Sequence, residues 1–282
     1  MLNEYYFEEI YIRHAIDEFP QDKDFNMHIH DTCEIYFFIS GAVNYLVEGS
    51  KYKLPDNSLM IMKPAESHKA QIVKSIRYER YAINFPLSFV KSIDPQGRLL
   101  CPFTERALGK NNFFGSSDID TQLIRRLLEE MCFENTDIYS KNLTITTHLW
   151  MILDIIYHAY TKRELPTPSP VSNAENMVQY INRHLLDELS VPMLAKHFYL
   201  STSQFNRVFK HATGAAPWDY ILQKRLTVAH EKIKQGCTAR EASEQCGFRE
   251  YSVFYRAYRK KYGCSPSQKS VHSKSSPFIK EK

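Results

Sequence analysis

The spacing of hydrophobic residues changes along the chain and divides it into regions. In residues 25–89, short runs of β-branched and aromatic residues are separated by turn-forming residues such as Gly41, Gly49 and Pro64. Short runs punctuated in this way are typical of an antiparallel sandwich or barrel. The predicted strands cover residues 34–39, 43–47, 59–62 and 80–85.

Two segments with helical periodicity follow this region. Residues 119–135 carry a hydrophobic residue at every fourth position from Ile119 to Met131, and residues 144–160 repeat hydrophobic residues at spacings of three and four. Each pattern predicts an amphipathic helix with one buried face. The pair either covers the β-rich core or forms the seam of a dimer.

Three closely spaced prolines mark the predicted domain boundary. Pro166, Pro168 and Pro170 prevent helix formation and stiffen the chain, as a linker requires. Beyond them only helical periodicity is found, so the predicted fold class is α+β. The predicted N-terminal domain covers residues 1–161 and holds a β-barrel or jelly roll at about 20–90 and helices at about 119–160. The linker at 162–172 follows it. The all-α domain covers residues 173–270, and a disordered tail covers residues 271–282.

The all-α region begins with the pattern of a helix-turn-helix. Ser190 is a typical N-cap, followed by Pro192 in the first turn of a helix. Ser201 caps the next helix, over residues 202–213, which ends at Gly214. This second helix has one hydrophobic face and one polar, basic face, which is the arrangement of a DNA-recognition helix.

The same pattern recurs further along the chain. A helix capped by Thr238 ends at Gly247, and another follows over about residues 250–262. Between the two units, residues 217–234 predict one continuous helix that begins with a proline. A rigid helix of this kind can hold two recognition helices about 34 Å apart, one turn of DNA.

Charge is distributed unevenly between the two halves. The chain has 36 Lys and Arg against 32 Asp and Glu, a net charge of +4. Residues 171–282 hold 18 of the basic and only 9 of the acidic residues, so the rest of the chain is acidic. A basic C-terminal half indicates a polyanionic partner, or else a basic surface with no partner.

Composition also excludes several classes of protein. The six cysteines are widely spaced and include no C-x-x-C pair, which argues against a disulfide framework or a zinc ribbon. The N-terminus is acidic where a signal peptide is basic, and the most apolar stretch, residues 149–160, is interrupted by Asp154 and His158. We therefore expect a cytoplasmic protein without a membrane partner.

The β-rich region contains a cluster of potential ligands. His28 and His30 are followed by Glu34, and His68 lies four residues after Pro64. In a regular strand the first three point to one face, and a later strand end could bring His68 beside them.

This spacing resembles the cupin motif over about residues 27–85. In metal-dependent cupins the positions matching the three histidines and Glu34 bind a divalent transition ion, for which these side chains are suitable ligands. The second motif departs from that pattern, because Pro55 is followed by Asp56-Asn57 where the metal cupins have Gly two residues after the proline. We therefore predict no cofactor and a pocket for a small polar effector, with metal binding as the alternative. The predicted pocket residues are His28, His30, Glu34, Tyr36, Tyr45 and His68.

The C-terminal region resembles the AraC/XylS family of bacterial transcription regulators. The resemblance covers about residues 174–268 and is carried by LSVPMLAKHFYLSTSQFNRVFKHATGAAPWDYILQKRL and CGFREYSVFYRAYRKKYGCSPSQ. An N-terminal cupin followed by two helices is also the arrangement of the ligand-sensing members of this family. Two departures occur: Ala242-Ser243 stands where Ile-Ala is usual, and Lys269-Ser270 where Tyr-Arg is usual.

The resemblance implies a function for the exposed faces of the two recognition helices. Arginine can bond guanine and asparagine can bond adenine in the major groove, whereas basic residues one turn further along contact phosphates. The predicted base-reading residues are Ser203, Asn206 and Arg207 in the first unit and Tyr251, Ser252, Tyr255 and Arg256 in the second. The predicted phosphate-contacting residues are Lys210, Arg259 and Lys260.

The sequence thus predicts a ligand-responsive, homodimeric regulator of transcription that is not an enzyme. It would bind double-stranded DNA and, as an activator, RNA polymerase. By analogy with the family it would control an uptake or catabolic operon, with a sugar as effector. The alternatives are a metal-dependent cupin enzyme with a helical appendage and an architectural DNA-binding protein without an effector.

Overall fold

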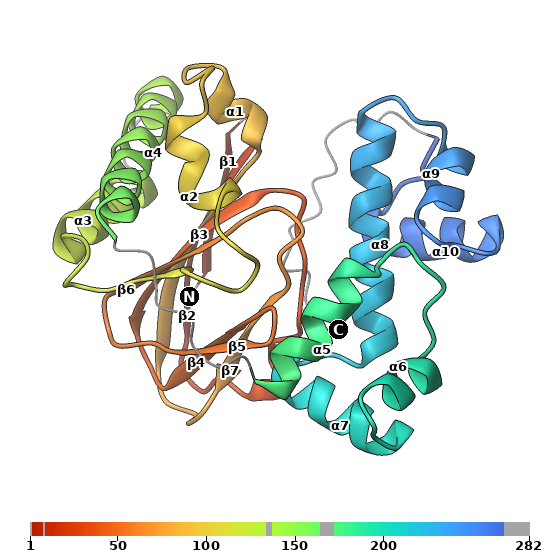
Figure 1. Ribbon diagram of the computed structural model, residues 1–282. Helices are drawn as coiled ribbons and strands as arrows, with labels where there is room; N and C mark the ends of the chain where they lie inside the picture. Colours follow the sequence, from red (N-terminus) through yellow and green to blue (C-terminus); the bar gives the residue numbers. More distant parts are fainter. Residues whose placement is uncertain (1, 8, 134–136, 164–171, 268–282) are drawn as a thin grey trace.

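The strands of the N-terminal domain form two sheets that face each other. The computed structural model describes residues 2–7, 9–133, 137–163 and 172–267. The larger sheet has the order β1-β2-β8-β3-β6-β9 and the smaller has the order β5-β4-β7 (Figure 1). The strands are β1 Leu2–Phe7, β2 Ile10–Asp17, β3 Cys33–Ser40, β4 Val43–Val47, β5 Ser50–Lys53, β6 Ser58–Met62, β7 His68–Ile72, β8 Tyr78–Phe85 and β9 Phe113–Phe114.

Each face of the central strand β3 packs against a different layer. Ile35 and Phe37 point toward the helices, whereas Tyr36 and Phe38 point toward the smaller sheet. Because successive side chains of a strand alternate between its faces, covering both faces buries nearly the whole strand. The domain is therefore built in three layers, with the helices, the larger sheet and the smaller sheet in that order.

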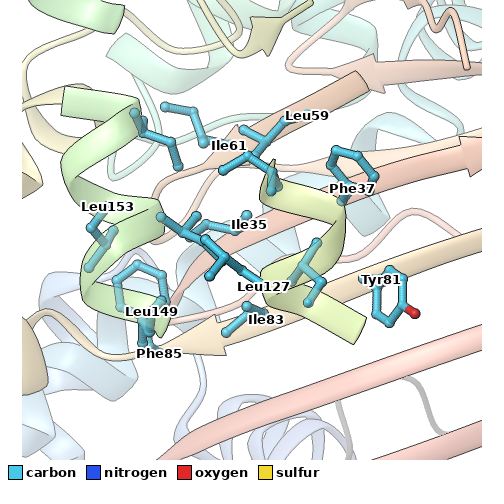
Figure 2. Close-up of a cluster of buried hydrophobic side chains, with 14 of the residues drawn as sticks. Ile35, Phe37, Leu59, Ile61, Tyr81, Ile83, Phe85, Leu127, Leu149 and Leu153 are labelled. Carbon is cyan, nitrogen blue, oxygen red and sulfur yellow. The ribbon is translucent and has the colours of Figure 1, made fainter. Parts of the chain in front are cut away.

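The helical layer covers the larger sheet, which is one of the two roles that the sequence left open for it. Helices α3 (Thr121–Cys132) and α4 (Ile138–Thr161) pack Leu127, Leu149 and Leu153 onto Ile35 and its neighbours, as Figure 2 shows. Both helices begin after an aspartate N-cap, Asp120 and Asp137, whose carboxylates accept hydrogen bonds from the first turn. Shorter elements precede these helices: α1 Leu87–Lys91, the 3-10 turn Arg98–Leu100 and α2 Cys101–Thr104.

The β-rich region differs from the prediction in two respects. Strands begin at Leu2 rather than near residue 20, because β1 and β2 form a hairpin on the edge of the larger sheet. Charged side chains in β2 hide its strand character in the sequence; in the structure His14 pairs with Glu79 on the neighbouring strand. The sheets also remain separate in their hydrogen bonding, so the described strands do not close into a barrel.

The C-terminal domain is built from helices alone over its described residues, shown in green to blue in Figure 1. Helix α8 runs the length of this domain and contributes to both of its hydrophobic cores. Tyr220 and Ile221 join the core of the first unit, and Leu226 and Ala229 join that of the second. The helices are α5 Asn173–Arg183, α6 Val191–His197, α7 Thr202–Thr213, α8 Pro217–Lys234, α9 Ala239–Gln245 and α10 Tyr251–Tyr262.

The predicted linker and tail fall largely outside the described residues. Helix α4 ends at Thr161 and α5 begins at Asn173. Residues 164–171 and the tail at 271–282 lie outside the part of the chain that the structure describes.

Candidate functional site

The first helix-turn-helix unit is held by caps at the start of each helix. Ser190 caps α6 by accepting a hydrogen bond from the backbone N–H of Met193. Ser201 and Gln204 form a reciprocal capping box at the start of α7. Phe205 and Phe209 are completely buried in the core of this unit. These contacts fix α7 through one face and leave its opposite face for another molecule.

The predicted reading residues of α7 lie on that opposite face. Ser203, Arg207 and Lys210 are exposed, and Asn206 is half-buried. The Asn206 amide donates a hydrogen bond of 2.8 Å to the carbonyl of Thr202, one turn earlier. Asn206 must therefore exchange this bond to read a base, whereas Arg207 is already available.

The second unit repeats this arrangement, except that no side chain caps the start of α10. Thr238 and Glu241 form a capping box on α9, and Phe254 and Tyr258 of α10 are buried against α8 and α9. The exposed face carries the residues predicted to contact DNA: Ser252, Arg256, Arg259 and Lys260 are exposed, and Tyr251 and Tyr255 are half-buried. The unusual pair Ala242-Ser243 is buried, so these small side chains occupy a core position.

An arginine not singled out in the sequence joins the two units. The guanidinium of Arg225, in the middle of α8, donates hydrogen bonds to the carbonyls of Leu185, Asp187 and Gly247 at 2.6–2.8 Å. Gly247 has a φ of 74°, and a Cβ there would lie 2.9 Å from the Arg225 guanidinium carbon. Glycine is therefore required at this position by both backbone conformation and space. The sequence signal that could have pointed to this role of Arg225 is an arginine on the buried side of a predicted helix.

The three histidines and the glutamate predicted to line a pocket do come together. One potential ligand atom from each of His28, His30, Glu34 and His68 lies within 4.8 Å of the others. Only Glu34 and His68 are in strands; His28 and His30 precede β3 in an extended segment, where His28 forms a backbone bridge with His68. The expectation that the first two histidines lie in a regular strand was wrong, but their rings still converge.

Glu34 is the centre of this cluster. Its Oε2 lies 3.0 Å from His30 Nε2 and 3.2 Å from His68 Nε2, and it accepts a hydrogen bond of 3.2 Å from Asn84. Burial disfavours a charged carboxylate, but His68 and His30 outweigh that cost and lower the pKa of Glu34. Glu34 is therefore a buried carboxylate facing imidazole nitrogens.

The histidines differ in their preferred protonation. Burial lowers the pKa of His28 and of His30. Burial also opposes protonation of His68, but the nearby Glu34 carboxylate outweighs it and raises the pKa of His68. The cluster thus combines two imidazoles with lowered pKa values and one, His68, whose pKa is raised beside the Glu34 carboxylate.

The two predicted pocket tyrosines lie beside this cluster between the sheets. Tyr36 and Tyr45 are buried, with ring centroids 4.6 Å apart, and the Tyr45 ring stacks at 6.1 Å from that of His68. The Tyr36 hydroxyl is hydrogen-bonded to that of Tyr78. All six predicted pocket residues are thus brought together, and their use by an effector stays a prediction.

Two family models match the two domains. A model described as an AraC-like ligand binding domain matches residues 11–132, and a helix-turn-helix domain matches residues 194–270. The chain belongs to the AraC family of transcriptional regulators. AraC-family proteins are regulators rather than enzymes, which removes the cupin-enzyme alternative.

Individual AraC-family proteins match this chain over different shares of its length. The chain is 26% identical to an uncharacterized HTH-type transcriptional regulator, YobQ of Bacillus subtilis, over 86% of this chain and 87% of that one. It is 37% identical to a probable transcriptional regulator, LumQ of Photobacterium leiognathi, over 33% of this chain and 39% of LumQ. The DNA-binding domain of AdpA, solved with a target DNA, is 28% identical over 33% of this chain and 85% of that chain, with a TM-score of 0.32.

The two domains of this AraC-family chain are joined by buried polar contacts that the sequence did not reveal. Lys224 of α8 forms an ion pair with Glu48, at the turn between β4 and β5, and both side chains are almost completely buried. The Tyr220 hydroxyl donates a hydrogen bond of 2.5 Å to Glu48, and the Asn182 amide donates one of 2.8 Å. Burial, followed by the Glu48 charge, raises the pKa of Tyr220.

A second interdomain contact lies at the other end of α8. Asp31 Oδ2 lies 3.3 Å from His230 Nε2 and 3.5 Å from Lys234 Nζ. Burial disfavours the Asp31 carboxylate, but His230 and Lys234 outweigh it and lower its pKa. Helix α8 is thus held to the N-terminal domain at two places.

Among the residues that the structure describes, none of the helices combines the length and the hydrophobicity that crossing a membrane requires.

Proposed function

We propose that this protein is an effector-responsive activator that reads a specific sequence of double-stranded DNA with α7 and α10. The observation that carries the proposal is the pair of helices α7 and α10, each buried on one face and basic on the other, that pack on the single helix α8. A regulator that binds chromosomal DNA acts in the cytoplasm, and an activator also contacts RNA polymerase.

Base reading and phosphate contact are assigned to different residues of the two helices. Arg207 and Arg256 are long, exposed donors suited to guanine, and Ser203, Ser252, Tyr251 and Tyr255 lie near them on the same faces. Lys210, Arg259 and Lys260 are exposed further along their helices. They would supply affinity that depends on salt but not on sequence.

The proposed homodimer uses the outer face of α4. Tyr139, Leu143 and Met151 are 76%, 53% and 46% exposed and recur on one side of this helix. Helix α4 buries its opposite side on the larger sheet, so the outer face is available to a second copy. Two copies would present two pairs of recognition helices to DNA.

The proposed effector binds in the N-terminal domain, around the cluster of His28, His30, Glu34 and His68 and the adjacent Tyr36 and Tyr45. Its control of DNA binding requires that it bind two arrangements of the domains with different affinity. The contacts of α8 with Asp31 and Glu48 supply the element through which such a difference reaches the recognition helices. A sugar effector and an uptake or catabolic operon stay predictions from the family resemblance.

Binding selection with genomic fragments, followed by affinity measurements on three variants, tests the proposal. We expect Arg207→Ala to weaken the selected site by about 1–3 kcal/mol and to relax one base position. Lys260→Ala should weaken all sequences about equally and reduce the dependence on salt. The matched control is Arg126→Ala, a change on α3 in the other domain. Unchanged specific affinity in Arg207→Ala would show that α7 does not read the bases.

A further inference from the structure

We propose that Arg225 is a positioning residue for DNA reading: it holds the two helix-turn-helix units in one fixed arrangement and thereby sets the spacing between the two DNA segments that α7 and α10 read. The inference rests on the proposed function for its effect on DNA. The fixed arrangement itself is argued from the contacts between the two units.

Helix α8 connects the two units through two separate hydrophobic cores. Tyr220 and Ile221 belong to the core of the first unit, and Leu226 and Ala229 belong to that of the second, further along the same helix (Figure 1). A small change in how either core packs on α8 would turn one recognition helix relative to the other. Fixing that angle requires a second connection between the units.

The side chain of Arg225 supplies this connection. It leaves α8 between the residues of the two cores and is 5% exposed. Its Nε and Nη2 donate hydrogen bonds of 2.8 and 2.6 Å to the carbonyls of Leu185 and Asp187, in the segment between α5 and α6. Its Nη1 donates one of 2.6 Å to the carbonyl of Gly247, in the turn between α9 and α10. One planar group thus bonds both units.

Each of these two segments is anchored in the core of its own unit. Leu185 and Leu189 are buried in the same core as Phe205 of α7. Phe248 packs against the second core, where its ring centroid lies 5.1 Å from that of Phe254 of α10. The directions of the guanidinium hydrogen bonds therefore constrain both recognition helices.

The backbones of the two units also meet beside the guanidinium. A Cβ placed on Gly247 would lie 2.9 Å from the Arg225 guanidinium carbon and 3.0 Å from the carbonyl oxygen of Leu186. Both distances are shorter than an ordinary van der Waals contact. The turn of the second unit thus lies against the first unit without space for a side chain, and a packed contact of this kind resists relative movement.

An arginine suits this role better than other side chains. The guanidinium is planar and holds its N–H donors in fixed directions, whereas the ammonium group of a lysine rotates freely. The three acceptors of Arg225 are neutral carbonyls, and burial lowers its pKa, so the folded domain holds this charge against an energetic penalty. A hydrophobic side chain would avoid that penalty but would fix no direction.

A fixed arrangement of the units makes DNA binding sensitive to spacing. Recognition helices one turn of DNA apart meet the major groove at segments about 10 base pairs apart. One base pair inserted between the segments moves the second by about 3.4 Å and rotates it by about 35° around the duplex axis. Rigidly joined helices cannot both follow this change, whereas helices that move independently can. Arg225 therefore determines which spacing the protein accepts.

Binding to DNA with altered spacing tests the inference. The fragment obtained by genomic selection is footprinted and then prepared with zero, one or two base pairs inserted between the two protected segments. We expect one inserted base pair to weaken binding at least about thirtyfold in the full-length wild type and at most about fivefold in Arg225→Lys. Arg225→Lys should also bind the original fragment about severalfold more weakly, because its units are no longer preorganised.

Arg249→Ala is the matched control. Arg249 pairs with Glu188 across the same gap between the units, but the two side chains are 80% and 79% exposed, so this ion pair contributes little. The control should keep the spacing dependence of the wild type. An equal loss of affinity on insertion in the wild type and Arg225→Lys would overturn the inference. Arg225→Gln, which is uncharged and keeps one planar donor group, is used if Arg225→Lys does not fold, and failure of both to fold would also overturn it.

Amide hydrogen exchange separates this role from a contribution to the stability of the cores, and it requires no DNA. In Arg225→Lys, exchange should be faster in residues 184–190 and 246–250, while α7 and α10 keep the protection of the wild type. Faster exchange throughout both recognition helices would show that Arg225 stabilises the cores instead. If the chain selects no DNA fragment, the proposed function fails, while the exchange experiment still decides whether Arg225 holds the units together.

Discussion

At the scale of single residues, the turns of the two helix-turn-helix units differ in backbone strain. Tyr199 and Gly247 occupy corresponding positions after α6 and α9, and both have a positive φ, 56° and 74°. Glycine adopts this conformation freely, whereas a tyrosine is strained in it. The Tyr199 side chain is 96% exposed, so little packing offsets the strain.

We therefore expect Tyr199→Gly to stabilise the C-terminal domain. The relief of backbone strain exceeds the greater flexibility that glycine gives the unfolded chain, for a gain of about 0.5–1 kcal/mol in the free energy of unfolding. Urea unfolding of the wild type and the variant measures this gain in the free energy of unfolding. The reverse change, Gly247→Ala, should destabilise, because the new Cβ would lie 2.9 Å from the Arg225 guanidinium. Destabilisation by Tyr199→Gly would instead show that the exposed tyrosine ring makes a contact that stabilises the folded domain.

At the scale of elements, the sequence predicted best where a helix carries its own boundaries. Helices α7 and α8 have the predicted limits, because Ser201 and Gly214 cap the first and Pro217 begins the second. Strands β5 and β7 were missed because their sequences, SKYK and HKAQI, are polar and form strands only through pairing with β4. Local caps are visible in a sequence, whereas pairing between distant segments is not.

The packing of α10 on α8 makes the stability of the second unit depend on pH. The Lys261 ammonium donates hydrogen bonds to Thr227 at 2.7 Å and to the carbonyl of Gln223 at 3.2 Å. Burial lowers the pKa of Lys261 to about 7, against an ordinary value of 10.5. Between these values the unfolded chain binds a proton that the folded chain has lost, so the free energy of unfolding rises with pH.

Relative to Lys261→Met, we expect the wild type to gain about 1 kcal/mol of stability between pH 7 and pH 8. Urea unfolding of both proteins at the two pH values gives this difference, and the comparison cancels groups that titrate in both. Parallel pH dependence in wild type and variant would mean that Lys261 keeps its ordinary pKa.

At the scale of the whole molecule, the exposed basic faces of α7 and α10 were predictable and the contact between the domains was not. Exposed basic residues recur with helical spacing within each recognition helix, so α7 and α10 can be recognised from local sequence. Glu48 and Lys224 lie far apart in the sequence, and each resembles an ordinary surface charge until the fold buries them together. The same holds for Asp31 and its partners on α8.

The buried ion pair of Glu48 and Lys224 predicts how the contact between the domains changes when one partner is removed. Lys224→Met leaves the Glu48 carboxylate enclosed without its countercharge, which costs about 3–5 kcal/mol if the domains stay docked. Separation of the domains returns Glu48 to water and avoids that cost without unfolding either domain. We therefore expect Lys224→Met to increase the radius of gyration in small-angle X-ray scattering and to speed amide exchange in α8, while exchange in α4 stays unchanged.

The double variant Glu48→Gln/Lys224→Met distinguishes the role of charge from that of packing. It removes both charges together. The Ser67 N–H now bonds Oε1 of Glu48 and the Tyr220 hydroxyl bonds Oε2, so the amide oxygen introduced at position 48 can replace one of these two acceptors. Because no unpaired charge remains buried, the domains should dock nearly as in the wild type. If the double variant separates as fully as Lys224→Met, the ion pair itself holds the domains together. If neither variant separates, the contacts of Asp31 and the apolar surface around α8 are sufficient to keep the recognition helices attached to the N-terminal domain.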